Sequence, residues 1–108
     1  MCVALCGPKV HVVSVILKEA VDTAKEAEKV IKRLKDCNLP EENSFAFMFA
    51  CIGRGKAHYN GTENVESSVF KKYFPKTPLF GFFGNGEVGF DHLINFSNDI
   101  SENATEVL

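Results

Sequence analysis

The sequence predicts an α+β fold in which a mixed β-sheet of about five strands carries two helices packed on one face. The first observation behind this prediction is an unbroken run of eight apolar residues, 45–52, which Ser44 and Gly53 bound. Such a run is typical of a strand buried on both faces, and it is far shorter than the ~20 residues of a membrane span. The second observation is helical periodicity on each side of the run, and the third is a pair of β-like stretches toward each end of the chain. The predicted order is β-β-α-β-α-β-β.

Length and composition are those of an ordinary globular domain. The chain has 108 residues, of which 45% are hydrophobic and 24% charged, and its net charge is −2. No basic face accumulates, so we expect no nucleic-acid partner, and the lack of a spanning segment predicts no membrane partner. Residues 1–94 are predicted to form the domain, and the polar residues 95–108 to form a flexible tail.

The cysteines and the N-terminus bear on location. Four cysteines are present, and the start of the chain lacks the basic and long apolar regions of a signal peptide. We expect Cys37 and Cys51 to be reduced, packed thiols, and we expect a cytoplasmic or nuclear location. The abrupt entry into a β-like stretch at Met1 suggests a fragment of a longer protein.

The first two predicted strands are residues 2–6 and 10–17. The three residues between them, Gly-Pro-Lys, are typical of a turn, so the pair is expected to form an antiparallel hairpin. A helix over residues 23–36 follows. Thr23 and Glu26 have capping-box spacing, apolar residues recur at steps of three and four, and the Asn-Leu-Pro that follows is typical of a helix end.

The central strand, residues 45–52, has two different faces. One face carries the large side chains together with a thiol: Phe45, Phe47, Phe49 and Cys51. The opposite face carries mostly small ones: Ala46, Met48, Ala50 and Ile52. Two helices on one side of the sheet leave the other side bare, so we expect a missing domain or a second chain to cover it.

The second helix is predicted to begin after Asn64, with acidic residues in its first turn and lysines in its last, as the helix dipole favours. Residues 79–84 are the next predicted strand. Asn85-Gly86 then predicts a type I′ hairpin turn, and residues 87–94 are expected to return as the paired strand.

Cys51 raises the hypothesis of a catalytic thiol. Such a thiol needs a nearby base and a lowered pKa, and the bases available are His11, His58 and His92. Because Cys51 lies in the most apolar run, a buried structural thiol is the favoured interpretation. Arg54, three residues on, would raise the thiolate character of Cys51, so a modifiable thiol stays open as an alternative and a catalytic one is not expected.

Two glycine-bearing segments carry the remaining candidate site. Gly53-Arg54-Gly55 either cradles an anion or forms a turn with a solvent-facing arginine, and the residues alone leave both open. Glu87 either belongs to a tight hairpin, the favoured interpretation, or faces Arg54 in an ion pair or a polar-ligand site. The candidate binding residues are Cys51, Gly53, Arg54, Gly55, Asn85, Gly86 and Glu87. Neither metal-ligand spacing nor a nucleotide fingerprint occurs, so no metal or cofactor is expected.

Together these segments resemble a known family. The motifs that carry the likeness are Phe47-Met-Phe-Ala-Cys51-Ile-Gly-Arg-Gly55, Asn64-Val-Glu66, Phe74-Pro75 and Pro78-Leu-Phe-Gly-Phe-Phe-Gly-Asn-Gly-Glu87-Val-Gly89. In order and spacing they are similar to the C-terminal part of the FIST domain (F-box and intracellular signal transduction). The resemblance extends over about residues 3–91 and includes residues 22–28 and 39–41.

The resemblance implies a substrate-recognition module of an F-box-type (Skp1–cullin–F-box) ubiquitin ligase receptor, which binds target proteins for ubiquitination and is not an enzyme. By that analogy Cys51 and the Gly53-Arg54-Gly55 segment belong to the recognition surface. Bacterial members imply an alternative, a sensory domain for a small amino-acid-like ligand, with Arg54 and Glu87 holding its charged groups.

Three departures from the family pattern limit what the resemblance implies. No F-box precedes the matching segment, so a Skp1–cullin complex is expected to bind only through an F-box absent from this chain. The N-terminal half of the domain is missing. The stretch after residue 91 differs from the family's usual continuation, which suggests a truncated or alternatively ended product.

Overall fold

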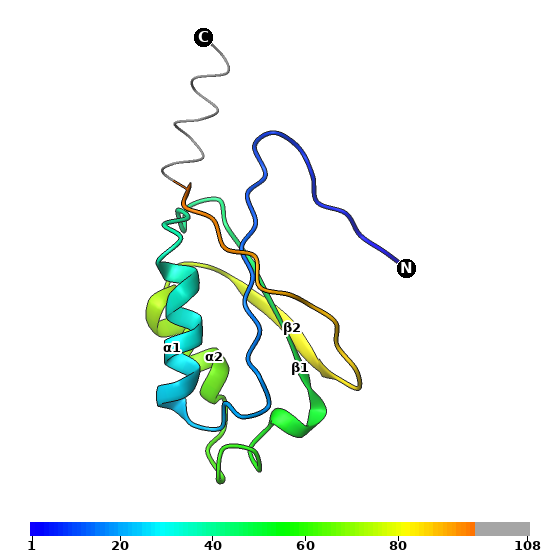
Figure 1. Ribbon diagram of the computed structural model, residues 1–108, viewed down its shortest axis with the longest axis vertical. Helices are drawn as coiled ribbons and strands as arrows, with labels where there is room; N and C mark the ends of the chain where they lie inside the picture. Colours follow the sequence, from blue (N-terminus) through cyan, green and yellow to red (C-terminus); the bar gives the residue numbers. More distant parts are fainter. Residues whose placement is uncertain (97–108) are drawn as a thin grey trace.

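The computed structural model describes residues 1–96, and residues 97–108, most of the predicted tail, lie outside the described part. In chain order its elements are α1 (Ala24–Lys35), β1 (Ala46–Cys51), the short 3₁₀ helix η1 (Ile52–Arg54), α2 (Val65–Tyr73) and β2 (Leu79–Gly84). Figure 1 shows both helices on the same side of the two strands. Two layers are therefore present, helices on strands, and the second side of the sheet faces away from both helices.

Local sequence defines both ends of α1. Thr23 has an extended backbone at the N-cap position, and its Oγ1 accepts a hydrogen bond from the Glu26 N–H at 3.2 Å. Beyond the C-terminus, Asn38 has the left-handed φ of 60° that commonly closes a helix. Ala27 and Ile31, one turn apart, are buried. The predicted helix over residues 23–36 is confirmed.

Replacing Thr23 with Ala should lower the free energy of unfolding by about 1 kcal/mol, because the first turn of α1 loses the acceptor for one of its free N–H groups. Thr23→Ser keeps a hydroxyl at the same place and should retain most of that stability. Urea denaturation of both variants measures the difference. Equal losses in the two variants would show that the hydroxyl does not cap the helix.

α2 begins in a different way from the prediction. Asn64 is the N-cap residue, but its backbone is left-handed, with φ 57°, and its side chain makes no capping hydrogen bond. Its carbonyl oxygen instead accepts the N–H of Ser68 at 2.9 Å and starts the helical ladder. The helix buries one face, which includes an acidic residue: Val65, Glu66, Val69 and Phe70.

The core lies between the helices and the inner face of the strands. Its fully packed members come from both helices and the residue after α2: Ile31, Val69, Phe70 and Phe74. Ala46, Met48 and Leu79 of the strands pack against this cluster. At the surface, the Glu28 carboxylate of α1 accepts hydrogen bonds from Lys72 Nζ at 2.7 Å and from the Tyr73 hydroxyl at 2.6 Å. The two helices are thus joined by both apolar packing and a polar clasp.

The sheet is smaller than the sequence predicts. Within residues 1–96 it has two parallel strands, so the prediction of a mixed sheet of about five strands is wrong. Its register runs from Ala46 opposite Leu79 to Cys51 opposite Gly84. The parallel direction follows from the crossover through α2, because such a connection returns the chain to the same end of the sheet.

The predicted N-terminal hairpin does not form, although its turn does. The Val10 N–H donates to the Gly7 carbonyl at 3.1 Å, but residues 2–6 are exposed and pair with no described strand. A two-stranded hairpin that packs against nothing has little stability in water. Ser14 instead pairs antiparallel with His92, through N–H to carbonyl hydrogen bonds of 2.8 and 2.9 Å.

The predicted C-terminal hairpin is also absent. Gly86 has the positive φ, 104°, but Asn85 does not, and a type I′ turn requires both. The chain after this bend therefore leaves β2 and runs beside the N-terminal segment. There the Asp91 carboxylate accepts the Ile16 N–H at 2.8 Å and pairs with Arg33 Nη1 at 3.2 Å. Bonds to Ser14, Ile16 and α1 replace the expected strand pairing.

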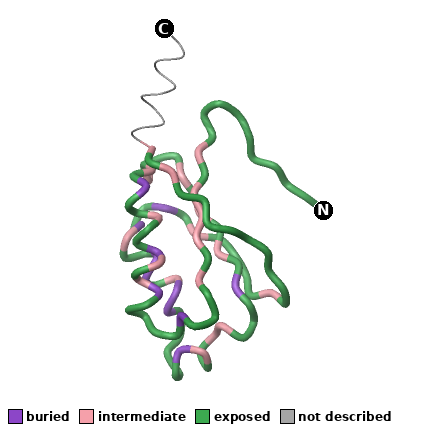
Figure 2. The backbone as a smooth tube through the Cα atoms, viewed as in Figure 1, coloured by how far each residue is buried: buried purple, intermediate pink, exposed green. Residues whose placement is uncertain are grey.

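One face of the sheet is uncovered. We call the aromatic face the five outward rings of Phe45, Phe47, Phe49, Phe80 and Phe82, which are 53–66% exposed. Figure 2 shows the buried residues gathered mainly in the helices, with exposed residues along the N-terminal stretch. The alternation predicted for residues 45–52 is confirmed over residues 45–51, because the small side chains of β1 face the helices. The prediction is wrong for Ile52, which lies in η1 and is 71% exposed. The expectation that this chain leaves one side of the sheet bare is confirmed for residues 1–96.

Candidate functional site

The two glycine-bearing bends leave the same edge of the sheet. Cys51 and Gly84 are the last partners of the parallel register, so η1 and the Asn85–Glu87 bend begin side by side. The Gly-Arg-Gly segment continues from β1 through η1 to Gly55. Parallel pairing thus brings together two segments that are more than thirty residues apart in the sequence.

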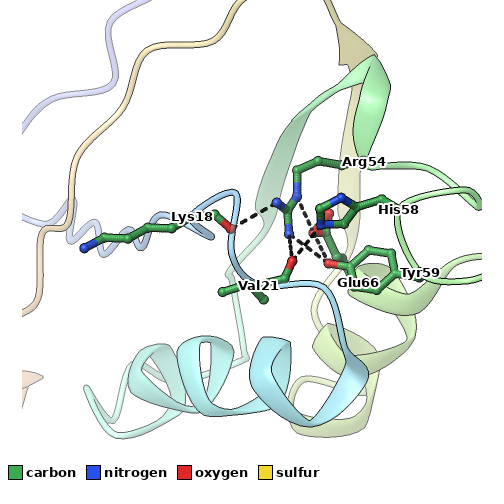
Figure 3. Close-up of polar contacts among 6 residues, drawn as sticks. All are labelled: Lys18, Val21, Arg54, His58, Tyr59 and Glu66. Atoms are coloured by element: carbon green, nitrogen blue, oxygen red, sulfur yellow. Dashed lines mark hydrogen bonds and ion pairs between the residues drawn. The ribbon is translucent and has the colours of Figure 1, made fainter.

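Arg54 points into the protein from this edge. Its Nε donates to Glu66 Oε2 at 3.0 Å, Nη1 to the Lys18 carbonyl at 3.1 Å, and Nη2 to the Val21 carbonyl at 2.8 Å and the Tyr59 hydroxyl at 2.9 Å. Figure 3 shows the guanidinium enclosed between the segment that precedes α1 and the start of α2. Four donor contacts occupy most of the five N–H groups of the side chain. Arg54 is therefore a structural anchor that ties three segments together.

The Arg54–Glu66 ion pair is largely buried. The side chains are 11% and 9% exposed, which removes most of the solvent that weakens surface pairs. Burial lowers the pKa of Arg54, but the hydrogen bond and charge of Glu66, together with Tyr59, outweigh that effect and raise it overall. The arginine is charged at every relevant pH, so the pair is permanent in the folded protein.

Tyr59 and His58 complete this network. The Tyr59 hydroxyl donates to Glu66 Oε2 at 2.7 Å, while His58 Nε2 lies 2.8 Å from the Val21 carbonyl oxygen. Val21 O is thereby held by both His58 and Arg54. These contacts fix the loop before α1 against the start of α2. Both residues therefore have a structural role.

The ionisation of Tyr59 gives a direct test of the network. Its burial, followed by the hydrogen bond and charge of Glu66, raises the pKa of Tyr59 from 10.0 to about 12. The folded state holds the phenolic proton more tightly than the unfolded state, so this stabilising contribution is present below about pH 10 and is lost between pH 10 and 12. Absorbance titration of a Tyr73→Phe variant, in which Tyr59 is the remaining tyrosine, should give a midpoint near 12. A midpoint near 10 in the folded protein would contradict the buried network.

The hypothesis that Arg54 faces Glu87 is not supported by the arrangement of side chains. In the described part of the chain the ion pair of Arg54 is with Glu66. Glu87 is exposed, and its carboxylate folds back over the strand end, with Oε1 3.2 Å from where a Cβ on Gly84 would stand. The two backbone segments are neighbours, but the Arg54 guanidinium points into the protein and the Glu87 carboxylate lies at the surface.

The other predicted site residues lie near the surface of this edge. We call the sheet-end surface Cys51, Gly53, Gly55, Asn85, Gly86 and Glu87, of which Gly55 is half-buried and the others exposed. Cys51 is exposed, so the expectation of a buried thiol there is wrong, whereas Cys37 is buried as predicted. Within residues 1–96 no histidine hydrogen-bonds to the Cys51 thiol, which leaves it without the base that a catalytic cysteine uses.

A pocket of about 250 Å³ lies along β2 beside the second half of β1 and the start of α2, and its lining includes Phe80 and Phe82 of the aromatic face. Its apolar walls include Met48, Ala50, Val65, Leu79 and Phe83. Its polar wall is the anchored network of Arg54, Tyr59 and Glu66. A space of this size suits a small molecule or a single side chain. In the described residues no cluster of metal-binding side chains occurs, and no helix has the length and apolarity to cross a bilayer.

Sequence reasoning missed Glu66 as the partner of Arg54. A signal was present: Glu66 lies one turn before Val69 and Phe70 on the buried side of α2, where an acid requires a partner. Val21 and Lys18 contribute carbonyl oxygens, and no residue type indicates such a role.

The chain is similar to known proteins. The family model of the FIST C domain matches residues 6–90, a range that includes both bends and every residue of the Arg54 network. F-box only protein 22 of Homo sapiens and that of Pongo abelii are each 46% identical to the chain over 101 residues. The match covers 94% of this chain and 25% of each relative, so the chain spans about a quarter of their length. The chain belongs to the FIST C domain family.

Proposed function

We propose that this chain is a non-enzymatic protein-recognition module of the kind that an F-box-type ubiquitin ligase receptor uses to hold its target proteins. The observation that carries the proposal is the sheet-end surface, where two bends are exposed side by side above the buried, hydrogen-bonded Arg54 anchor. The similarity to F-box only protein 22 supports the same proposal. Ubiquitin transfer, and contact with Skp1 and cullin through an F-box, would be functions of other polypeptide segments, acting in the cytoplasm or nucleus.

The chemistry of the sheet-end surface suits protein contact. Its glycines let a partner backbone approach closely, since Gly53, Gly55 and Gly86 have no side chain to hold it away. The amide of Asn85 and the carboxylate of Glu87 supply polar groups at the rim. Because Arg54 fixes the bend from inside, little backbone entropy is lost on binding, which favours affinity.

The test joins this chain to an F-box and measures both capture and ubiquitination of bound proteins. Glu87→Arg should release proteins that the unchanged chain captures, and it should lower their ubiquitination. Glu42→Arg is the matched control, because Glu42 is exposed and lies before β1, at the opposite end of that strand from the sheet-end surface. Identical capture by all three proteins would remove the sheet-end surface from recognition.

A second candidate, a sensor of a small ligand, is favoured by the cavity beside Arg54 and Tyr59. In this version the ligand fills the cavity and bonds to the polar wall, since Arg54 is already engaged with Glu66 and does not form a clamp with Glu87. A thermal-shift screen with amino acids tests it: a ligand at 100 times its Kd adds about 2.7 kcal/mol of stability. The absence of any shift across the screen would count against a sensor.

A further inference from the structure

We propose that two copies of this chain associate through the aromatic face, each covering the other's Phe45, Phe47, Phe49, Phe80 and Phe82. The inference does not depend on the proposed function, because the aromatic face lies on the flat of the sheet and the sheet-end surface lies at its edge.

The rings form one continuous surface. Parallel pairing sets Phe47 beside Phe80 and Phe49 beside Phe82, and the centroids of these pairs are 6.4 and 5.1 Å apart. Along β1 the ring of Phe47 lies 5.4 Å from that of Phe45 and 5.7 Å from that of Phe49. Contacts within the layer hold the rings in place. The face is therefore preformed, and little side-chain freedom is lost when it is covered.

The exposed area is enough for a weak dimer. Each ring is more than half exposed, between 53% for Phe45 and 66% for Phe82. A buried aromatic side chain covers roughly 150–250 Å², so five half-exposed rings leave on the order of 500 Å² on each copy and about 1,000 Å² in a face-to-face pair. This total is at the lower limit for a specific interface, so the dimer should be weak and should form as the protein concentration rises.

The chemistry of the face favours a second copy as its occupant. Neither strand contains a charged residue, since β1 reads AFMFAC and β2 reads LFGFFG. A two-fold interface brings each group toward its own equivalent, so a charge on such a face would meet a like charge. Here rings meet rings, and aromatic pairs are stable in offset or edge-to-face arrangements. Two sheets that pack in this way lie about 10 Å apart and bury no unpaired polar side chain.

The experiment is sedimentation velocity of the 108-residue chain from low to several hundred micromolar concentration. The expected result is a concentration-dependent rise from the 11.9 kDa of one chain to twice that mass. Phe82→Ser should weaken the dimer by about tenfold or more, because it removes the most exposed of the five rings, 66% exposed, and its contact with Phe49. Phe90→Ser is the matched control: Phe90 is 69% exposed but lies beyond β2, so the dissociation constant should stay within about twofold.

Circular dichroism and thermal melting of both variants establish that each is folded. A chain that stays at 11.9 kDa at every concentration would overturn the proposal, even if an unrelated protein were found to bind the face. Dimerisation that Phe82→Ser leaves unchanged would also overturn it, since pairing would then use the strand edges or another surface. Equal weakening by Phe82→Ser and Phe90→Ser would overturn it as well, by showing general loss of hydrophobicity as the cause.

Discussion

Replacing Arg54 with Met is expected to lower the free energy of unfolding by about 3–5 kcal/mol, the usual effect of removing one member of a buried ion pair. The substitution leaves the Glu66 carboxylate, 9% exposed, without its cation. It also removes donors from the carbonyls of Lys18 and Val21. Methionine keeps much of the side-chain volume, so the loss reports on hydrogen bonds and charge more than on packing.

Chemical denaturation of the wild-type and Arg54→Met chains measures this effect. Lys56→Met is the matched control, because the Lys56–Glu63 pair is 62% and 68% exposed and should contribute less than about 0.5 kcal/mol. A loss below about 1 kcal/mol in Arg54→Met would show that the anchor does not stabilise the fold. A consequence for binding studies is that lost partner binding in an Arg54 variant would report unfolding as readily as a lost contact.

Gly81→Ala should destabilise the protein by about 3 kcal/mol, the upper end of the range for overfilled interiors. A Cβ on Gly81 would stand 1.8 Å from the Met48 carbonyl oxygen and 2.7 Å from its carbon, and both atoms belong to the backbone of the adjacent strand. Flexible side chains yield to such a contact, but a strand backbone moves only if the pairing of β1 and β2 changes. The substitution would therefore disturb both the inner core and the aromatic face.

Gly89→Ala is the matched control for this prediction. No atom lies within 4 Å of where its Cβ would stand, and its φ is not in the left-handed region. Alanine there should be neutral or slightly stabilising, by up to about 1 kcal/mol, because it restricts the unfolded chain. Urea denaturation of the two variants gives the comparison. Similar stability of Gly81→Ala and Gly89→Ala would mean that the close approach of the two strands is wrong.

The elements that depend on local chemistry could be predicted from the sequence. The Thr23 cap, the stripe through Ala27 and Ile31 and the left-handed Asn38 each act on the nearest turns of the chain, and α1 forms as predicted. The two hairpins could not, because strand pairing depends on what else covers the strands. Within residues 10–17, Ser14 pairs with His92, far along the chain, and this competition has no local signal.

The candidate site was predictable in its backbone and not in its side chains. Two apolar strands on either side of a helix predict parallel neighbours, and parallel neighbours bring the bends after Cys51 and Gly84 to one edge. The direction of Arg54 depends on which acid competes best for it. Glu66 lies on the buried side of α2, and Arg54 pairs with it instead of with the exposed Glu87. A buried carboxylate without a cation costs far more free energy than an exposed one.

The central claim is that Arg54 anchors the bend from inside the protein and leaves the sheet-end surface free for partners. Two double-mutant cycles, measured by chemical denaturation, test it most directly: Arg54→Met with Glu66→Leu, and Arg54→Met with Glu87→Gln. The Arg54–Glu66 cycle should give a coupling energy of about 2–3 kcal/mol, and the Arg54–Glu87 cycle should give less than about 0.5 kcal/mol. A coupling of Arg54 to Glu87 as large as that to Glu66 would contradict the claim, since the arginine would then face the surface.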